Sequence, residues 1–465
     1  MRLPIGITII AALVGMLAVF GVGMIVLQPP TNLILAAQFE QATITPNADG
    51  DDDITFFTYD LARNATISIV LEGEDGRVYR FREDEPRIGQ AYRVAFSGVV
   101  DGYTLPDERF PDDVQIERRL IPDGTYTWRF IAENADEREE RTGTLTITDA
   151  DSPLPLLTTF TIGTDVFTPN QDGVDDRVFI NVYLEKAADL RVFLLDEQGI
   201  EQPIAQRREG SREGEAGRYT FDYDGGVDLG QDPPPDGTYN VIAVAQDAEG
   251  QRVRRVRDLT IALGGKPRAE ISPQFVDTEV LYTVGDYQPQ YASDLASAGE
   301  TIPLPALPDE LDVRLVTVPL GEMLVFRLTV HNYSDVPIRT TGPAPGTVYD
   351  YDQISSSLGA LEEPGAWRVG IQCDASLQSF PWRWAIGTDD DLITIADEDT
   401  GREFQYLPPQ TFSVVWGAIR MNEIPVENPQ TCWAGLIHEG VAISLQNAFV
   451  DPREIQVADT TSETE

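Results

Sequence analysis

Cysteine and histidine are scarce in this sequence. Only Cys373 and Cys432 are present, 59 residues apart, so a four-cysteine zinc site is excluded and at most one disulfide can form. We expect that disulfide if this part of the chain lies outside the cytoplasm; the alternative is two buried free thiols. The only histidines are His331 and His438, which leaves little room for histidine-based nucleophile activation or a transition-metal cluster.

Positive charge is also scarce: 34 Lys and Arg face 77 Asp and Glu, which gives a net charge of -43. Proteins that bind nucleic acid neutralise phosphates with Lys and Arg, so we predict no nucleic-acid partner. An excess of carboxylates keeps a protein soluble and attracts divalent cations. Either effect would account for the composition.

Motifs of the common enzyme classes are missing. The sequence has no Gly-x-Ser-x-Gly elbow, no phosphate-binding loop and no dinucleotide fingerprint. We therefore predict that the protein is not an enzyme. A carboxylate-based glycoside hydrolase stays as an alternative, because a pair of carboxylates can hydrolyse glycosides without any short motif.

The N-terminal segment is apolar. From Ile5 to Leu27 there are 23 consecutive residues without a charge, enough to span a bilayer core of about 30 Å. A cleavable signal peptide has a shorter apolar region, and the best cleavage site, Leu35-Ala36-Ala37, lacks a small first residue. We predict an uncleaved, single-pass membrane anchor at residues 1–30. Arg2 precedes it and the next positive charge is Arg63, so the C-terminal part should be extracytoplasmic.

An internal repeat follows the anchor. Residues 44–54 read ITPNADGDDDI and residues 167–178 read FTPNQDGVDDRV, which places Pro46 and Pro169 123 residues apart. Gly76 and Gly199 keep the same spacing. The segment PDGTY then recurs from residue 122 and from residue 235, 113 residues apart. The first copy therefore contains about ten additional residues between these landmarks.

Both copies have the pattern of β-strands. Tyr126, Trp128 and Phe130 alternate with polar residues, as in a half-buried strand. Asp75-Gly76 and Gln198-Gly199 are typical of hairpin turns. Short strands separated by Gly and Pro turns over about 110 residues indicate a β-sandwich. We predict one sandwich at residues 38–148 and another at 158–264, joined by a linker at 149–157.

The Thr-Pro-Asn-x-Asp-Gly-x-x-Asp opening and the Pro-Asp-Gly-Thr-Tyr segment resemble the immunoglobulin-like domains of the flagellar hook-capping protein and of secreted bacterial surface proteins. The opening is also similar to the C-terminal modules of gliding-motility proteins. The resemblance covers residues 38–264. It implies an immunoglobulin-like fold and an extracellular or structural setting, without a single activity.

The opening of each repeat is also a candidate calcium site, because oxygen ligands alternate around a glycine that allows a sharp turn. The loop is shorter than a helix-flanked calcium loop, with Phe56 and Phe179 where its bidentate Glu would stand. In the alternative, the Asn and Asp side chains cap a turn through local backbone hydrogen bonds. The candidate ligands are the side chains of Asn47, Asp49 and Asp53 with the carbonyl of Asp51, and those of Asn170, Asp172 and Asp176 with the carbonyl of Val174.

A different β-rich domain is predicted at residues 275–450, after a second linker at 264–274. It contains five of the six tryptophans. Aromatic residues in a sandwich core are the simpler interpretation; the alternative is a surface platform for sugar rings or a partner protein, with Trp382 and Trp384 on one face of a strand. The acidic tail at residues 451–465 is predicted to be disordered.

Together these features predict an all-β protein with two tandem immunoglobulin-like sandwiches and a third sandwich-like domain behind one transmembrane helix. We expect a membrane-anchored bacterial cell-surface protein with a structural or adhesive role. The repeats would act as spacers and the third domain would bind an envelope protein or a polysaccharide. The alternative is an envelope component of a secretion or motility system.

Overall fold

The computed structural model describes residues 12–19, 32–196, 198–274, 278–285, 296–307, 315–397 and 400–459. These residues form β-sheets almost throughout, which confirms the all-β prediction. The chain divides into two compact units. One comprises Met1–Thr161, Ile180–Phe221 and Asn240–Arg257, and the other comprises Ile162–Phe179, Asp222–Tyr239 and Asp258–Glu465.

The predicted membrane anchor, residues 1–30, lies largely outside the described residues. Of this segment the structure describes residues 12–19, which form a helix with exposed side chains. Among the residues that are described, no helix combines the length and the apolar character needed to cross a membrane.

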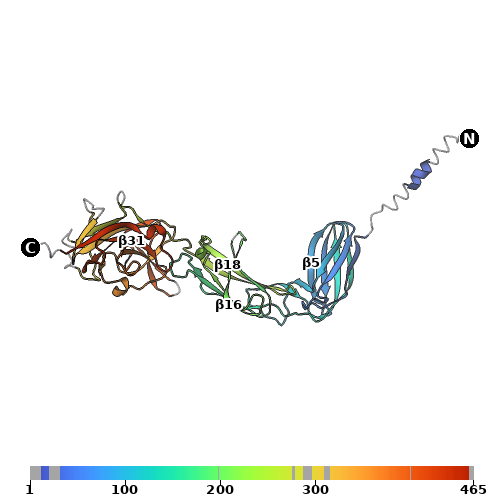
Figure 1. Cartoon of the computed structure of the whole chain (residues 1–465). Helices are drawn as coiled ribbons and strands as arrows, with labels where there is room; N and C mark the ends of the chain where they lie inside the picture. Colours follow the sequence, from blue (N-terminus) through green and yellow to red (C-terminus); the bar gives the residue numbers. More distant parts are fainter. Residues whose placement is uncertain are drawn as a thin grey trace, which may run out of the picture. The chain divides into compact units, whose positions relative to one another are not determined.

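Repeat 1 consists of two sheets that enclose one core. The sheets have the orders β1-β3-β6 and β2-β10-β9-β4-β5. Tyr126, Trp128 and Phe130 are buried between them, as the alternation in the sequence predicts. The first strand begins before the predicted boundary at residue 38. The strands are β1 (Ile34–Phe39), β2 (Thr43–Ile44), β3 (Thr55–Leu61), β4 (Ala65–Glu72), β5 (Val78–Arg87), β6 (Ala91–Phe96), β7 (Val99–Asp101), β8 (Val114–Leu120), β9 (Gly124–Glu133) and β10 (Arg138–Ile147) (Figure 1).

Repeat 2 has the same plan. Its sheets have the orders β11-β13-β17-β16 and β15-β14-β18-β19, with β12 added alongside β19. The predicted turns at Gly76 and Gly199 join antiparallel partners, β4 to β5 and β14 to β15. The elements are β11 (Leu157–Ile162), β12 (Val166–Phe167), β13 (Val178–Leu184), β14 (Asp189–Leu195), β15 (Glu201–Pro203), β16 (Gln206–Gly210), β17 (Gly217–Tyr223), the 3-10 turn η1 (Val227–Leu229), β18 (Gly237–Gln246) and β19 (Arg252–Ile261).

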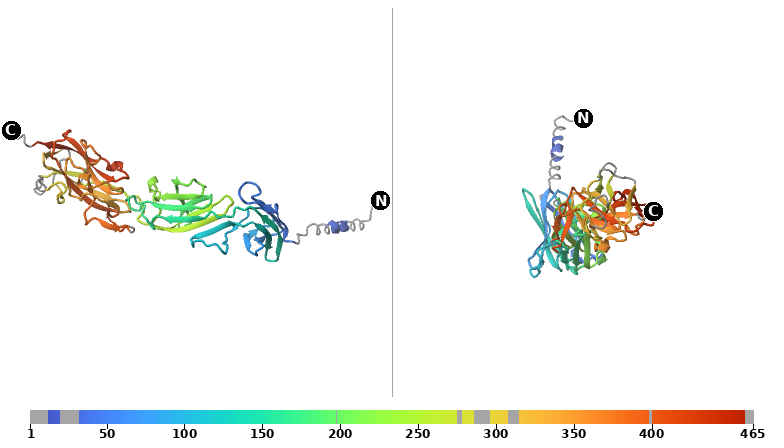
Figure 2. Two further views of the ribbon diagram at one scale, coloured as in Figure 1. Left: turned by 90° about the horizontal axis from the view of Figure 1, so that it is seen from below. Right: turned by 90° about the vertical axis from the view of Figure 1, so that its left-hand side faces the viewer.

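The additional residues of repeat 1 extend a sheet of repeat 2. They form the antiparallel strands β7 and β8 between β6 and β9. Strand β8 then pairs antiparallel with β19, where Arg255 lies opposite Val114. Figure 2 shows this insert in cyan beside the green strands of repeat 2. A length difference in the sequence therefore corresponds to a sheet that two repeats share.

Buried polar side chains support this shared sheet. The guanidinium of Arg255, 5% exposed, donates hydrogen bonds of 3.0 and 2.7 Å to the Asp113 carboxylate. The fully buried Gln251 accepts a hydrogen bond from the backbone N–H of Leu120 and donates to the carbonyls of Asp151 and Pro153 in the connecting segment. Residues 149–157, predicted as a plain linker, are thus fastened to both repeats.

The third domain is also built from two sheets. One has the order β20-β23-β30-β25 with β21 beside β23, and the other has the order β22-β32-β31-β26-β24-β29-β28 with β27 beside β26. The strands are β20 (Ala269–Ser272), β21 (Val280–Val284), β22 (Leu315–Pro319), β23 (Met323–Asn332), β24 (Ile338–Thr340), β25 (Val348–Asp350), β26 (Trp367–Cys373), β27 (Trp382–Ala385), β28 (Ile393–Ala396), β29 (Glu403–Leu407), β30 (Thr411–Arg420), β31 (Gln430–His438) and β32 (Val450–Ala458), with 3-10 turns η4 (Ser355–Leu358) and η5 (Leu445–Asn447).

Two predicted boundaries of this domain are wrong. It begins with β20, inside the predicted linker, because Ala269 and Ile271 are buried against β23. Residues 451–458, predicted to be disordered, belong to β32 between β22 and β31. Ile455 and Val457 are buried there, so two apolar side chains in an acidic segment are enough to attach it to the core. Residues 460–465 lie outside the described residues.

Candidate functional site

The acidic loop of repeat 1 is a turn stabilised by its own side chains. The carboxylate of Asp53 accepts backbone N–H groups of Asn47, Ala48 and Gly50 at 3.0, 2.8 and 2.7 Å. The side-chain oxygen of Asn47 accepts the N–H of Asp49, and Asp49 accepts that of Asp51. These are the local hydrogen bonds of the turn-capping interpretation.

The acidic loop of repeat 2 repeats this pattern. Asp176 accepts the N–H groups of Asn170, Asp172 and Gly173 at 3.2, 3.2 and 2.5 Å. Asp172 accepts the N–H of Val174 at 2.8 Å. In the part of the chain that the structure describes, no group of three or more His, Cys, Asp or Glu side chains is placed to hold a metal ion. Calcium binding stays a prediction.

The two loops differ in what surrounds them. The loop of repeat 2 is covered by the third domain, within one compact unit. The Tyr406 hydroxyl donates to the Asp172 carboxylate at 2.8 Å, and Arg339 Nε donates to the Asp172 carbonyl at 2.6 Å. His438 Nε2 lies 2.7 Å from the carbonyl oxygen of Gln171. We call these contacts, together with Gly173 and Gly365, the loop junction.

Two glycines bring the backbones of the loop junction together. A Cβ on Gly173 would lie 2.2 Å from the carbonyl oxygen of Pro364, and a Cβ on Gly365 would lie 2.1 Å from the carbonyl carbon of Asp172. Both glycines have positive φ angles, +83° and +82°. Arg339 Nη2 also donates to the Pro364 carbonyl, so one guanidinium bridges both backbones. Only glycine allows so close an approach.

The pKa values of the equivalent carboxyl groups Asp53 and Asp176 are shifted in opposite directions, because Asp176 is much more deeply buried. Backbone N–H donors hold the pKa of Asp53 below its usual value, although its slight burial acts in the opposite direction. Asp176 has equivalent donors, yet burial, followed by the charge of Asp172, raises the pKa of Asp176 to about 7. Burial likewise raises the pKa of Asp172. The third domain is what distinguishes these two environments.

His438 reaches the loop junction from β31. Its ring stacks on that of Trp367 at a centroid distance of 4.4 Å, and burial lowers the pKa of His438 to about 4. The imidazole is therefore neutral near pH 7, and Nε2 carries the proton when it donates to the Gln171 carbonyl. Arg339, Tyr406 and His438 were missed as partners of the acidic loop because they lie 167 to 267 residues from it in the sequence.

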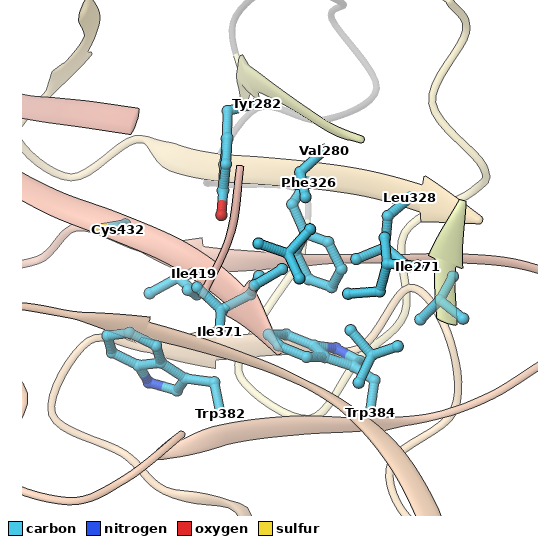
Figure 3. Packing of buried hydrophobic residues seen from close by; sticks show 14 of the residues in the cluster. Ile271, Val280, Tyr282, Phe326, Leu328, Ile371, Trp382, Trp384, Ile419 and Cys432 are labelled. Carbon is cyan, nitrogen blue, oxygen red and sulfur yellow. The ribbon is translucent and has the colours of Figure 1, made fainter. Parts of the chain in front are cut away.

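The predicted disulfide is present between Cys373 and Cys432, which lie opposite each other on β26 and β31. Trp382 and Trp384 are 2% and 0% exposed and belong to the core of the third domain. Figure 3 shows them packed with Phe326, Ile371 and other apolar side chains. The platform alternative is therefore wrong for these two rings, because neither presents a face to solvent.

The opposite pKa shifts predict opposing effects of pH on the loop junction. A folded-state pKa of about 7 for Asp176 means that stability falls as the pH rises from about 4 to about 7, because only the unfolded state then loses the proton. A folded-state pKa of about 4 for His438 means that stability rises between about pH 4 and 6.5, because only the unfolded state then carries the proton. The two effects offset each other over most of this range.

Substituting one of these two residues should remove its own pH effect on stability and leave that of the other residue. Relative to the unchanged chain, His438→Gln should make stability fall more steeply as the pH rises from about 4 to 7, and Asp176→Asn should make stability fall less steeply or rise, with the raised pKa of Asp172 still acting in the opposite direction to His438. Each change should amount to about 1–3 kcal/mol. Denaturant unfolding at a series of pH values measures both, and parallel pH profiles for the two variants would contradict this prediction.

Calcium should raise the melting temperature of the full chain if the loop of repeat 1 binds it, and magnesium should not. The variant Asp49→Ala should abolish this rise. Asp172 is unsuitable for the same test because its substitution would also remove the hydrogen bond from Tyr406. Equal melting temperatures in calcium and in chelator would leave the loop as a turn only.

No protein family and no curated protein matches the sequence. Among solved structures, the chain is similar to three N-terminal domains of the highly immunogenic outer capsid protein of bacteriophage RB49, at 10% identity and a TM-score of 0.22 over 92% of this chain and 99% of that one. It is also similar to a structure from a 1.5-MDa bacterial ice-binding adhesin, at 8% identity and a TM-score of 0.20 over 92% of this chain and 99% of that one. Likenesses at such TM-scores carry no argument about function.

Proposed function

We propose that the protein is a membrane-anchored, non-enzymatic surface protein in which two immunoglobulin-like repeats act as a spacer for a binding domain. The observation that carries this proposal is the strand pairing of β8 with β19, by which repeat 1 contributes to a sheet of repeat 2. Domains on flexible linkers move independently, whereas domains that share a sheet move as one. A spacer requires domains that move as one.

The loop junction supports the same role for repeat 2 and the third domain. Its contacts include a buried carboxylate, a shared guanidinium and a direct approach of two backbones. The apolar segment from Ile5 to Leu27 supports attachment to the membrane, with the β-domains on its outer side. The all-β architecture supports a structural or adhesive role.

Spin-label distances test the spacer within each compact unit. Pairs of labels at the exposed positions Ile88 and Ile200, and at Leu229 and Leu445, report on the first and second units respectively. We expect one narrow distance distribution for each pair in the full chain. Broad distributions for either pair would overturn the rigid-spacer part of the proposal.

Membrane attachment is tested separately in cells. The full chain should sediment with membranes after alkaline washing and should be digested by protease added outside the cells. A chain that lacks residues 1–31 should not sediment with membranes. Protection of the full chain from external protease would overturn the proposed orientation.

A further inference from the structure

Three loops meet at the end of the third domain that lies opposite the loop junction. Strands β26 and β31 run antiparallel between these ends: Trp367 pairs with His438 at the loop junction, and Cys373 pairs with Cys432 at the other end. The disulfide therefore lies where the loop of residues 374–381 begins and close to where the loop of residues 421–429 ends. The third loop, residues 351–358, follows β25. We call this set the terminal loops.

The terminal loops enclose a pocket of about 470 Å³. This volume lies within the usual range for small-molecule sites. Residues from all three loops line the pocket, so no single segment could form it. They are Tyr351, Asp352, Gln353, Ile354, Ser357, Ala375, Ser376, Leu377, Gln378, Pro381 and Glu423, and Trp382 at the start of β27 completes the lining.

Hydrogen bonds at the base of the pocket hold its loops in place. Ser355, in the 351–358 loop, donates through its backbone N–H at 2.9 Å and its hydroxyl at 3.2 Å to the carbonyl of Pro381. Asp374 and Thr431 exchange two hydrogen bonds beside the disulfide. The pocket is thus preorganised, which reduces the entropy lost on binding.

Two features of the lining indicate that the pocket is a binding site: a pair of aromatic rings and a buried hydrogen-bond donor. The rings of Tyr351 and Trp382 lie 5.5 Å apart, and the Tyr351 hydroxyl donates to Gln430. The buried Nε1 of Trp382 has no hydrogen-bond partner among the described residues. A buried donor without a partner is unfavourable, and a ligand oxygen that reached it would satisfy it.

The charges of the lining decide the class of ligand. The pocket contains the carboxylates of Asp352 and Glu423 and no Lys, Arg or His, which disfavours an anion. An amine could pair with the carboxylates, but it has no acceptor for the Trp382 indole or for the amide donors of Gln353 and Gln378. A hydroxyl group donates to carboxylates and also accepts from indole and amide N–H groups.

We propose that the pocket of the terminal loops binds a neutral, hydroxyl-rich ligand, namely a sugar residue of a polysaccharide. The carboxylates of Asp352 and Glu423 accept hydrogen bonds from its hydroxyls, and the half-buried ring of Tyr351 contacts its C–H faces. This inference rests on the proposed role of the third domain as a binding domain. It places that role at the end of the domain opposite the loop junction.

Fluorine NMR of the full chain labelled with 5-fluorotryptophan tests the proposal, in micelles of a detergent without a sugar headgroup. The six tryptophans give six signals, and Trp382→Phe identifies the relevant one. The probes are glucose, galactose, mannose and N-acetylglucosamine, with glucuronate as the anionic and ethylammonium as the cationic comparison. We expect at least one neutral sugar to shift the Trp382 signal saturably, and the buried Trp128 signal of repeat 1 to stay unchanged.

The double variant Asp352→Asn with Glu423→Gln should weaken this binding at least about tenfold, because two charge-assisted acceptors are lost. The matched control is Asp390→Asn, which changes an exposed carboxylate of the same domain outside the pocket. The proposal is overturned if no neutral sugar shifts the Trp382 signal, if ethylammonium shifts it more than every sugar, or if the double variant binds as the control does. Membrane attachment and narrow spin-label distances would persist in all three cases, so failure here is separable from failure of the spacer function.

Discussion

Replacing Glu439 by Gln should destabilise the third domain by about 3 kcal/mol, one of the two largest effects that we expect. The Glu439 side chain is 2% exposed and accepts hydrogen bonds from Arg368 at 3.2 Å and Arg383 at 2.9 Å. Arg368 is itself only 1% exposed. The substitution keeps the shape of the side chain but leaves two guanidinium charges without a buried counter-charge.

Denaturant unfolding followed through the fluorine signal of Trp384 measures this effect, because that ring lies in the same core. The control is Glu362→Gln. Glu362 also pairs with Arg383, but its side chain is 77% exposed, so the change should cost less than about 1 kcal/mol. Equal costs for the two variants would show that burial of the Arg368–Glu439–Arg383 group has no energetic role.

Replacing Gly173 by Ala should open the loop junction. The new Cβ would lie 2.2 Å from the Pro364 carbonyl oxygen, and backbone cannot move aside as a flexible side chain can. We expect a loss of about 1–3 kcal/mol through this clash, in addition to the strain of a positive φ. The distance distribution between labels at Leu229 and Leu445 should broaden as the junction opens.

The repeat supplies a matched control for this variant. Gly50 stands at the equivalent position of repeat 1 with a φ of +93°, and a Cβ there would meet nothing within 4 Å. Gly50→Ala should therefore cost only the backbone strain, about 1–2 kcal/mol. If Gly173→Ala costs no more than Gly50→Ala and the label distances stay narrow, the glycine contact does not hold the junction.

Local patterns in the sequence determined much of this fold. Alternation predicted the strand that buries Tyr126, Trp128 and Phe130, and the Asp-Gly and Gln-Gly pairs predicted two hairpin turns. Such features depend on residues that are close to each other in the sequence. Strand β32 was missed because its acidic residues outweigh the two apolar side chains that attach it.

The sequence by itself determined an all-β chain, a duplicated domain, the two cysteines able to form a disulfide, and the turn chemistry of the acidic loops. Only the tertiary structure decided what the repeated elements do. It placed the insert of repeat 1 against β19, buried one acidic loop and exposed the other, and brought three distant loops around one pocket. The physical reason is that these outcomes depend on contacts between residues tens to more than a hundred positions apart, where side-chain burial and backbone approach override local preference.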